Sequence, residues 1–146
     1  MDPFSPIAIL QEKHAQHVVL IHFPIALFLT GVFLDLTAKW SRRTHLATAA
    51  GINFLLAALA SVPTVITGFV AWWWALEAQK LKGVLLYHLL FGLTSAVLIW
   101  TVWLIRRRIS TPKDDLPAYL LSLEVAGVIV ISITGHLGGV LSGINV

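Results

Sequence analysis

Four long apolar stretches, separated by short polar segments, make up most of this chain. An α-helix needs roughly 20 predominantly apolar residues to cross a bilayer, and each stretch is at least that long. The sequence therefore predicts an all-α fold, an integral membrane four-helix bundle with up-down topology. The predicted spans are residues 17–38, 46–74, 84–105 and 116–141.

The segment before the first span predicts one further, shorter element. Ser5 followed by Pro6 is typical of a helix start, so residues 6–15 are predicted to form a short interfacial helix before the first span. No internal repeat is evident.

Composition supports a membrane protein and leaves little room for anything else. Hydrophobic residues make up 58% of the 146 positions and charged residues 12%, whereas soluble domains carry about 25% charged residues. The spans use nearly the whole length, so residues 1–146 are predicted to form one transmembrane domain. No catalytic residues are expected, because no nucleophile, base and orienting acid lie together at a water-accessible position.

The distribution of Lys and Arg predicts the orientation, because cytoplasmic loops carry the excess of positive charge. Seven basic residues are predicted on one side of the membrane: Lys39, Arg42, Arg43, Arg106, Arg107, Arg108 and Lys113. Three are predicted on the other: Lys13, Lys80 and Lys82. Both termini are thus predicted on the non-cytoplasmic side, which in a bacterium is the periplasmic face of the inner membrane. These basic residues lie at helix ends and form no nucleic-acid recognition surface.

Histidines are the candidate cofactor ligands, since the chain contains six of them and no cysteine. His22, His88 and His136 each lie about five residues inside a span, which places them in one layer some 7 to 8 Å below the non-cytoplasmic surface. His17 is about one turn shallower. The layer favours a cofactor or quinone site. Alternatively, each imidazole forms a hydrogen bond to a neighbouring helix and only stabilises the bundle.

A b-type haem is the cofactor that fits this layer best. In a bundle with short loops the first and third spans face one another, so His22 and His88 are predicted as the axial pair. His136 is then an alternative ligand, a hydrogen-bonding partner or part of a quinol pocket. His17 and His22 lie about 140° apart around the helix, so both cannot point at one centre without a kink.

Two further groups of polar residues accompany the histidines. Lys80 and Lys82, at the outer headgroup level, are candidates for pairing with haem propionates, or are simply solvated. Asp35, Asn53 and Glu124 form a second polar layer nearer the cytoplasm, where Glu124 is expected to face the bundle interior. It takes part in proton uptake, or it forms a hydrogen bond with Asn53; the sequence leaves both open.

The segment from His17 to Leu27, HVVLIHFPIAL, resembles the opening motif of the domain-of-unknown-function 2231 family (DUF2231) of small predicted bacterial membrane proteins. The resemblance covers almost the whole chain and includes Pro24, Thr30, Gly31, Asp35, His88, Gly138, Gly139 and Leu141. It implies four spans and a redox context, since members sometimes occur joined to or beside Rieske-type proteins. The corresponding partners are other subunits of a membrane redox complex, such as a Rieske-type or c-type cytochrome protein.

Three functions are compatible with these features. The first is a haem b-binding membrane subunit that transfers electrons between a quinone pool and a periplasmic redox partner. The second is a cofactor-free membrane anchor or assembly subunit of a redox complex. The third is a transporter or a copper or zinc site, with the metal held by His17, His22, His88 and His136.

Overall fold

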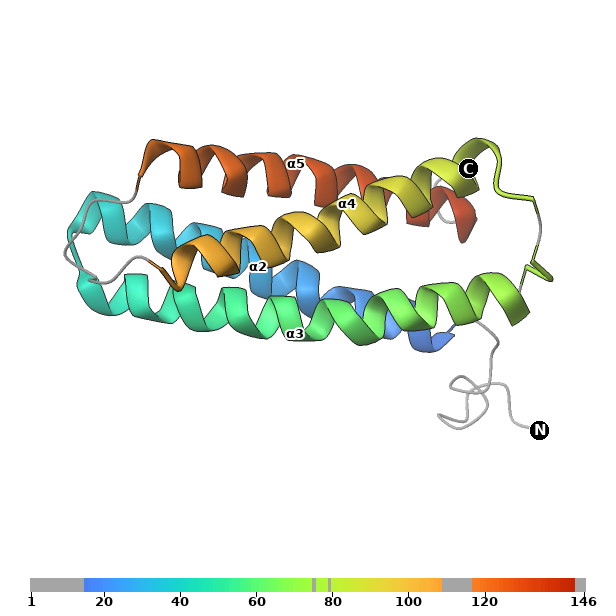
Figure 1. Cartoon of the computed structure of the whole chain (residues 1–146), viewed down its shortest axis with the longest axis horizontal. Helices are drawn as coiled ribbons and strands as arrows, with labels where there is room; N and C mark the ends of the chain where they lie inside the picture. The colour runs from blue at the N-terminus through green and yellow to red at the C-terminus, as the bar shows by residue number, and fades with distance from the viewer. Residues whose placement is uncertain (1–14, 75, 79, 109–116, 144–146) are drawn as a thin grey trace.

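The computed structural model describes residues 15–74, 76–78, 80–108 and 117–143. It contains four α-helices in chain order (Figure 1): α2 (Ala15–Ser41), α3 (Thr44–Trp74), α4 (Gly83–Arg106) and α5 (Ala118–Leu141). These helices confirm the predicted all-α, four-helix architecture, and their ends lie within three residues of the predicted span ends. The interfacial helix predicted for residues 6–15 lies outside the described residues, apart from Ala15.

The helices pack side by side with alternating direction. α2 and α4 begin at one end of the bundle, where α3 and α5 end (Figure 1). We call this the histidine end, because it holds His17 and His88, and the opposite end, which holds Arg106, the arginine end. The most extensive contacts are between α2 and α3 and between α4 and α5, so the bundle consists of two helical hairpins.

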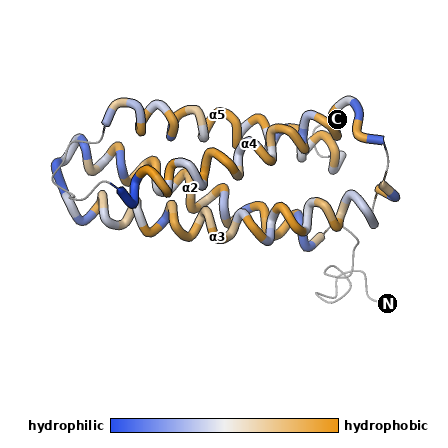
Figure 2. The backbone as a smooth tube through the Cα atoms, viewed as in Figure 1, coloured by the Kyte–Doolittle hydropathy of each residue, from blue (hydrophilic) through white to orange (hydrophobic). Residues whose placement is uncertain are grey.

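The outer surface of the bundle is apolar. At most 22% of the central window of each helix is buried inside the chain, and all four helices are long and apolar enough to cross a membrane. Hydrophilic positions gather at the ends of the helices, while the middle of the bundle is hydrophobic (Figure 2). The chain is thus a multi-pass membrane protein with four candidate spans, and its exposed side chains face lipid.

The core depends on glycines that allow aromatic rings to reach a neighbouring helix. Phe28 and Phe54 are fully buried, with ring centroids 5.4 Å apart. A Cβ atom at Gly127 would lie 2.6 Å from the Phe28 ring, and one at Gly31 would lie 2.8 Å from the Phe54 ring. Larger residues at either glycine would therefore force these rings out of place.

The second hairpin repeats the buried positions of the first. Every buried residue of α4 lies 71 positions after a buried residue of α2, and every buried residue of α5 lies 70 positions after a buried residue of α3. The seven matched pairs are Pro24 and Ser95, Phe28 and Ile99, Gly31 and Val102, Ala50 and Leu120, Phe54 and Glu124, Ala57 and Gly127, and Ser61 and Ile131.

Corresponding helices of the two hairpins therefore bury positions in the same register, 71 residues apart for α2 and α4 and 70 apart for α3 and α5. The residue types differ in all seven pairs. At these seven pairs burial is repeated but residue identity is not.

Candidate functional site

His17 of α2 and His88 of α4 face one another at the histidine end. Their ring centroids are 6.5 Å apart, and the ring planes cross at 84°. Both side chains are half-buried. They also occupy equivalent positions in the two hairpins, 71 residues apart, so the two imidazoles meet where the hairpins meet.

The second helix of each hairpin holds its histidine by the same interaction. Nδ1 of His17 lies 3.1 Å from the carbonyl oxygen of Thr64 on α3, and Nδ1 of His88 lies 3.1 Å from the carbonyl oxygen of Thr134 on α5. A carbonyl only accepts, so each Nδ1 carries the hydrogen and donates it. In the neutral imidazole, Nε2 is then the atom with a free lone pair, and it forms no hydrogen bond within the described residues.

A glycine lies one turn beyond each of these threonines, on the same face of its helix. A Cβ atom at Gly68 would be 3.0 Å from Cε1 of His17, and one at Gly138 would be 3.2 Å from Cε1 of His88. Each imidazole therefore packs directly against backbone. The Thr-x-x-x-Gly pattern occurs once per hairpin, at Thr64 to Gly68 and at Thr134 to Gly138.

The structure does not bring the other predicted ligands to this pair. His22 is exposed, and its Nδ1 donates to the carbonyl oxygen of Val18 on the same helix, 2.7 Å away. His136 is exposed as well, and so are Lys80 and Lys82 in the connection between α3 and α4. Among the described residues, no group of three or more His, Cys, Asp or Glu side chains is arranged to hold a metal ion.

A buried ionic group lies at the arginine end. Nη1 of Arg106 on α4 forms a salt bridge with Oδ2 of Asp35 on α2, which is fully buried. Nη2 of Arg106 donates to the carbonyl oxygen of Ala47 on α3, 2.7 Å away, and its Nε lies over Gly51. Asp35 and Arg106 are again 71 residues apart, so equivalent positions of the two hairpins meet at this end too.

Glu124 of α5 is the third member of this group. It is fully buried, and its carboxyl group interacts electrostatically with the Asp35 carboxyl group and the Arg106 guanidinium group. No donor in the described part of the chain reaches either oxygen of Glu124 or Oδ1 of Asp35. The predicted hydrogen bond between Glu124 and Asn53 is absent, because Nδ2 of Asn53 instead donates to the carbonyl oxygen of Ala49 on its own helix.

Sequence reasoning missed Arg106 as a member of this group. It was counted among the cytoplasmic loop charges, because it follows the last apolar residue of its span. The available signal was Asp35, a carboxylate inside a span that requires a cationic partner at the same depth. Arg106 is six residues closer to the end of its helix than Asp35 is to the end of α2, so a long side chain reaching inward meets that requirement.

Comparison with known proteins identifies a family. Residues 13–143 match the family described as predicted membrane protein (DUF2231). The chain belongs to this family. No curated protein and no solved structure matches it.

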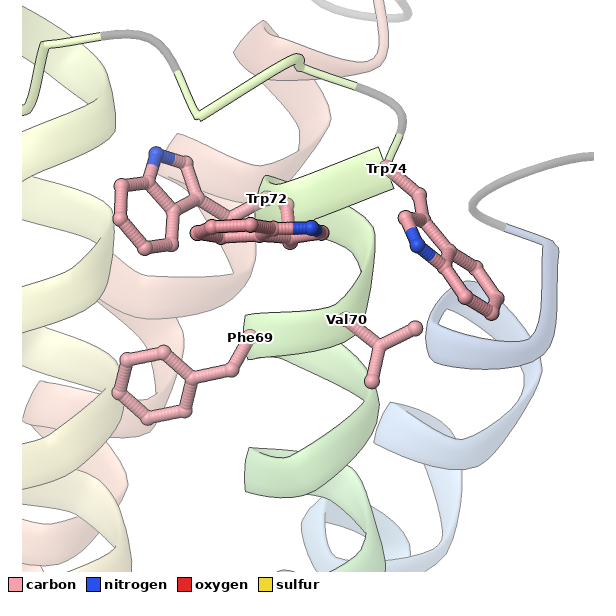
Figure 3. Close-up of a pocket in the computed structure, with 5 residues that line it drawn as sticks. Phe69, Val70, Trp72 and Trp74 are labelled. Atoms are coloured by element: carbon pink, nitrogen blue, oxygen red, sulfur yellow. The ribbon is translucent and has the colours of Figure 1, made fainter.

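In this DUF2231 chain one hollow on the surface is lined by apolar side chains. It has a volume of about 350 Å³ and lies near the end of α3 at the histidine end, where Trp74 and Phe69 project to different sides of the helix (Figure 3). Its lining is Phe69, Val70, Trp72, Trp73 and Trp74. With no ionisable residue in the lining, the hollow is suited to acyl chains at the membrane interface rather than to chemistry.

Proposed function

We propose that this DUF2231 chain is a haem b-binding membrane subunit that transfers electrons between the quinone pool and a periplasmic redox partner, with His17 and His88 as the axial ligands. The supporting observation is the pair itself: two imidazoles from facing helices, 6.5 Å apart, with each Nδ1 bound to a backbone carbonyl. When bound, haem supplies a one-electron redox centre.

His17 and His88 would hold the haem iron, and the 6.5 Å between their ring centroids supports this role. A bond from a metal to an imidazole nitrogen is about 2 Å long, so the centres of two opposed rings lie roughly 6 Å apart. The donation of Nδ1–H to a carbonyl is the usual second interaction of a metal-bound histidine, because it fixes the ring orientation and leaves Nε2 for the metal. Because Gly68 and Gly138 have no side chain, Cε1 of each ring packs against helix backbone.

His17 replaces His22 in this proposal. The sequence predicted both residues near the same end of the first span, but His22 is exposed on the bundle surface and its Nδ1 donates to a carbonyl oxygen within α2. The copper or zinc site of four histidines receives no support from the structure, because His22 and His136 are both exposed and lie apart from the pair.

The orientation in the membrane determines which redox partner the histidine end would face. Under the positive-inside rule, the arginine end lies at the cytoplasmic face of a bacterial inner membrane and the histidine end at the periplasmic face. A centre held by His17 and His88 is then close to a soluble or membrane-attached periplasmic partner, such as a Rieske-type or c-type cytochrome protein.

One visible absorption spectrum tests the assignment. The full chain, purified in detergent from haem-replete cells, should show a Soret band and, after reduction with dithionite, a sharp α-band. Both bands should disappear in His17→Ala and in His88→Ala and remain in the exposed-site controls His22→Ala and His136→Ala. A colourless wild-type protein, or bands that survive in both His17→Ala and His88→Ala, would contradict the proposal.

A cofactor-free anchor is the second candidate, and one observation favours it. His17 and His88 each bridge the two helices of a hairpin through a carbonyl, which stabilises the fold without any ligand. In that case the purified protein is colourless, and His17→Ala lowers the unfolding midpoint in an SDS titration while His22→Ala does not.

A further inference from the structure

The buried group of Asp35, Arg106 and Glu124 does not balance its charges. It contains two carboxyl groups and one guanidinium group, contributed by α2, α4 and α5. α3 adds no ionisable side chain, since its only such residue is His45, which is exposed. Two carboxylates and one cation would leave a net negative charge in a lipid-shielded site, which is costly.

The group also has too few hydrogen-bond donors for its carboxylate oxygens. Asp35 Oδ2 is satisfied by Arg106, but Oδ1 and both oxygens of Glu124 lack any donor in the described part of the chain. Two ionised carboxylates side by side offer only acceptors to each other. One proton on either carboxyl group makes the whole group neutral, and it supplies an O–H donor that joins two of these three oxygens.

We propose that Asp35 and Glu124 form a reversible proton-binding site, in which the two carboxyl groups share one proton and Arg106 compensates the remaining negative charge. The proton comes from water, associates with a carboxylate oxygen and returns to water, so no other reactant is needed. This proposal is independent of the haem proposal, because it uses neither His17 nor His88.

The site exchanges its proton at the arginine end. Asp35 and Glu124 each lie about six residues from the nearest end of their helix, or roughly 9 Å along its axis. Both are fully buried, whereas the Arg106 side chain is 11% exposed. Movement of Arg106 away from Asp35 is therefore the shortest way to admit water from that end. Four exposed basic residues lie at the same end of the bundle: Lys39, Arg42, Arg43 and Arg107.

Infrared spectroscopy of the full chain in liposomes tests the proton directly, because a protonated carboxyl group has a C=O stretch separate from that of a carboxylate, and the band shifts in D₂O. At neutral pH the wild type should show one such band. Glu124→Gln should abolish it. Asp35→Asn should abolish it too, because the single remaining carboxylate then pairs with Arg106. The exposed Glu77→Gln is the matched control and should keep the band unchanged.

Arg106→Met should strengthen the infrared band of the protonated carboxyl group instead of abolishing it. Without the cation, neutrality requires both carboxyl groups to be protonated, so the band should increase about twofold. Absence of the band in the wild type, or its persistence in Glu124→Gln or Asp35→Asn, would overturn the proposal. Should Arg106→Met fail to fold, as judged by circular dichroism, the two carboxyl variants still decide. A colourless protein with this band would remove the haem proposal and leave the proton site intact.

Discussion

For a single residue, the sequence predicts depth in the membrane better than it predicts direction. Counting residues from the end of a span placed His17, His22 and His88 near the histidine end. It did not show which imidazole points inward, because that depends on the rotation of α2, and the apolar surface of a membrane helix gives little guide to rotation when lipid and core are both apolar. His17 and His22 lie about 140° apart around the axis of α2, so only one of them can face His88 in a straight helix. The structure selects His17.

The sequence also did not show which glycines pack against an aromatic ring, because it gives their size and not their neighbours. Gly127→Ala should destabilise the protein by about 1 to 3 kcal/mol, because the new Cβ atom would lie 2.6 Å from the fully buried Phe28 ring and the ring would have to move. The measurement is the unfolding midpoint of the purified protein in an SDS titration. Gly135→Ala is the matched control on the same helix, since nothing lies within 4 Å of its added Cβ atom. Equal midpoints for the two variants would show that the Phe28 contact is not tight.

At the scale of the helix, the sequence was most informative. The ends of α2, α3, α4 and α5 follow from hydropathy for two reasons. The thickness of the bilayer sets the length of each apolar stretch, and a chain that crosses lipid must form a helix because its backbone groups can bond only to each other. The pairing of the helices into equivalent hairpins was not predicted, since the matched buried positions carry different residue types and few residues, such as His17 and His88, recur unchanged. Only the contacts reveal it: His17 meets His88, and Asp35 meets Arg106.

The contact between α3 and α4 joins the two hairpins through a polar interaction. Nε1 of Trp100 donates to Oγ of the buried Ser61, 3.2 Å away. Ser61→Ala removes the acceptor and leaves the indole N–H without a partner in an apolar environment, so the free energy of unfolding should fall by about 0.5 to 2 kcal/mol. Ser132→Ala is the control, because Ser132 is exposed and bonds only to Val128 in its own helix. An unfolding midpoint for Ser61→Ala that matches the control would contradict an energetic role for this bond.

At the scale of the whole molecule, the bundle has two different ends: an imidazole pair at one and a buried ionic group at the other. Asp35 and His17 lie on the same helix, 18 residues apart, or about 27 Å along its axis. That distance is most of the thickness of the hydrocarbon core, so the two groups lie near opposite ends of the spans. The sequence predicted both layers, but it assigned Arg106 to the surface charges that set orientation, whereas this residue also neutralises a buried carboxylate.

The orientation of the molecule can be tested without altering either layer, because the chain contains no cysteine. Glu77→Cys places a thiol in the connection at the histidine end, and Thr44→Cys places one at the arginine end; both positions are exposed. If the excess of Lys and Arg at the arginine end sets the topology, a membrane-impermeant maleimide should label Glu77→Cys in intact spheroplasts and Thr44→Cys only after the membrane is opened. The cysteine-free wild type controls for background. The reverse labelling pattern would place His17 and His88 at the cytoplasmic face, and a periplasmic redox partner would then be impossible.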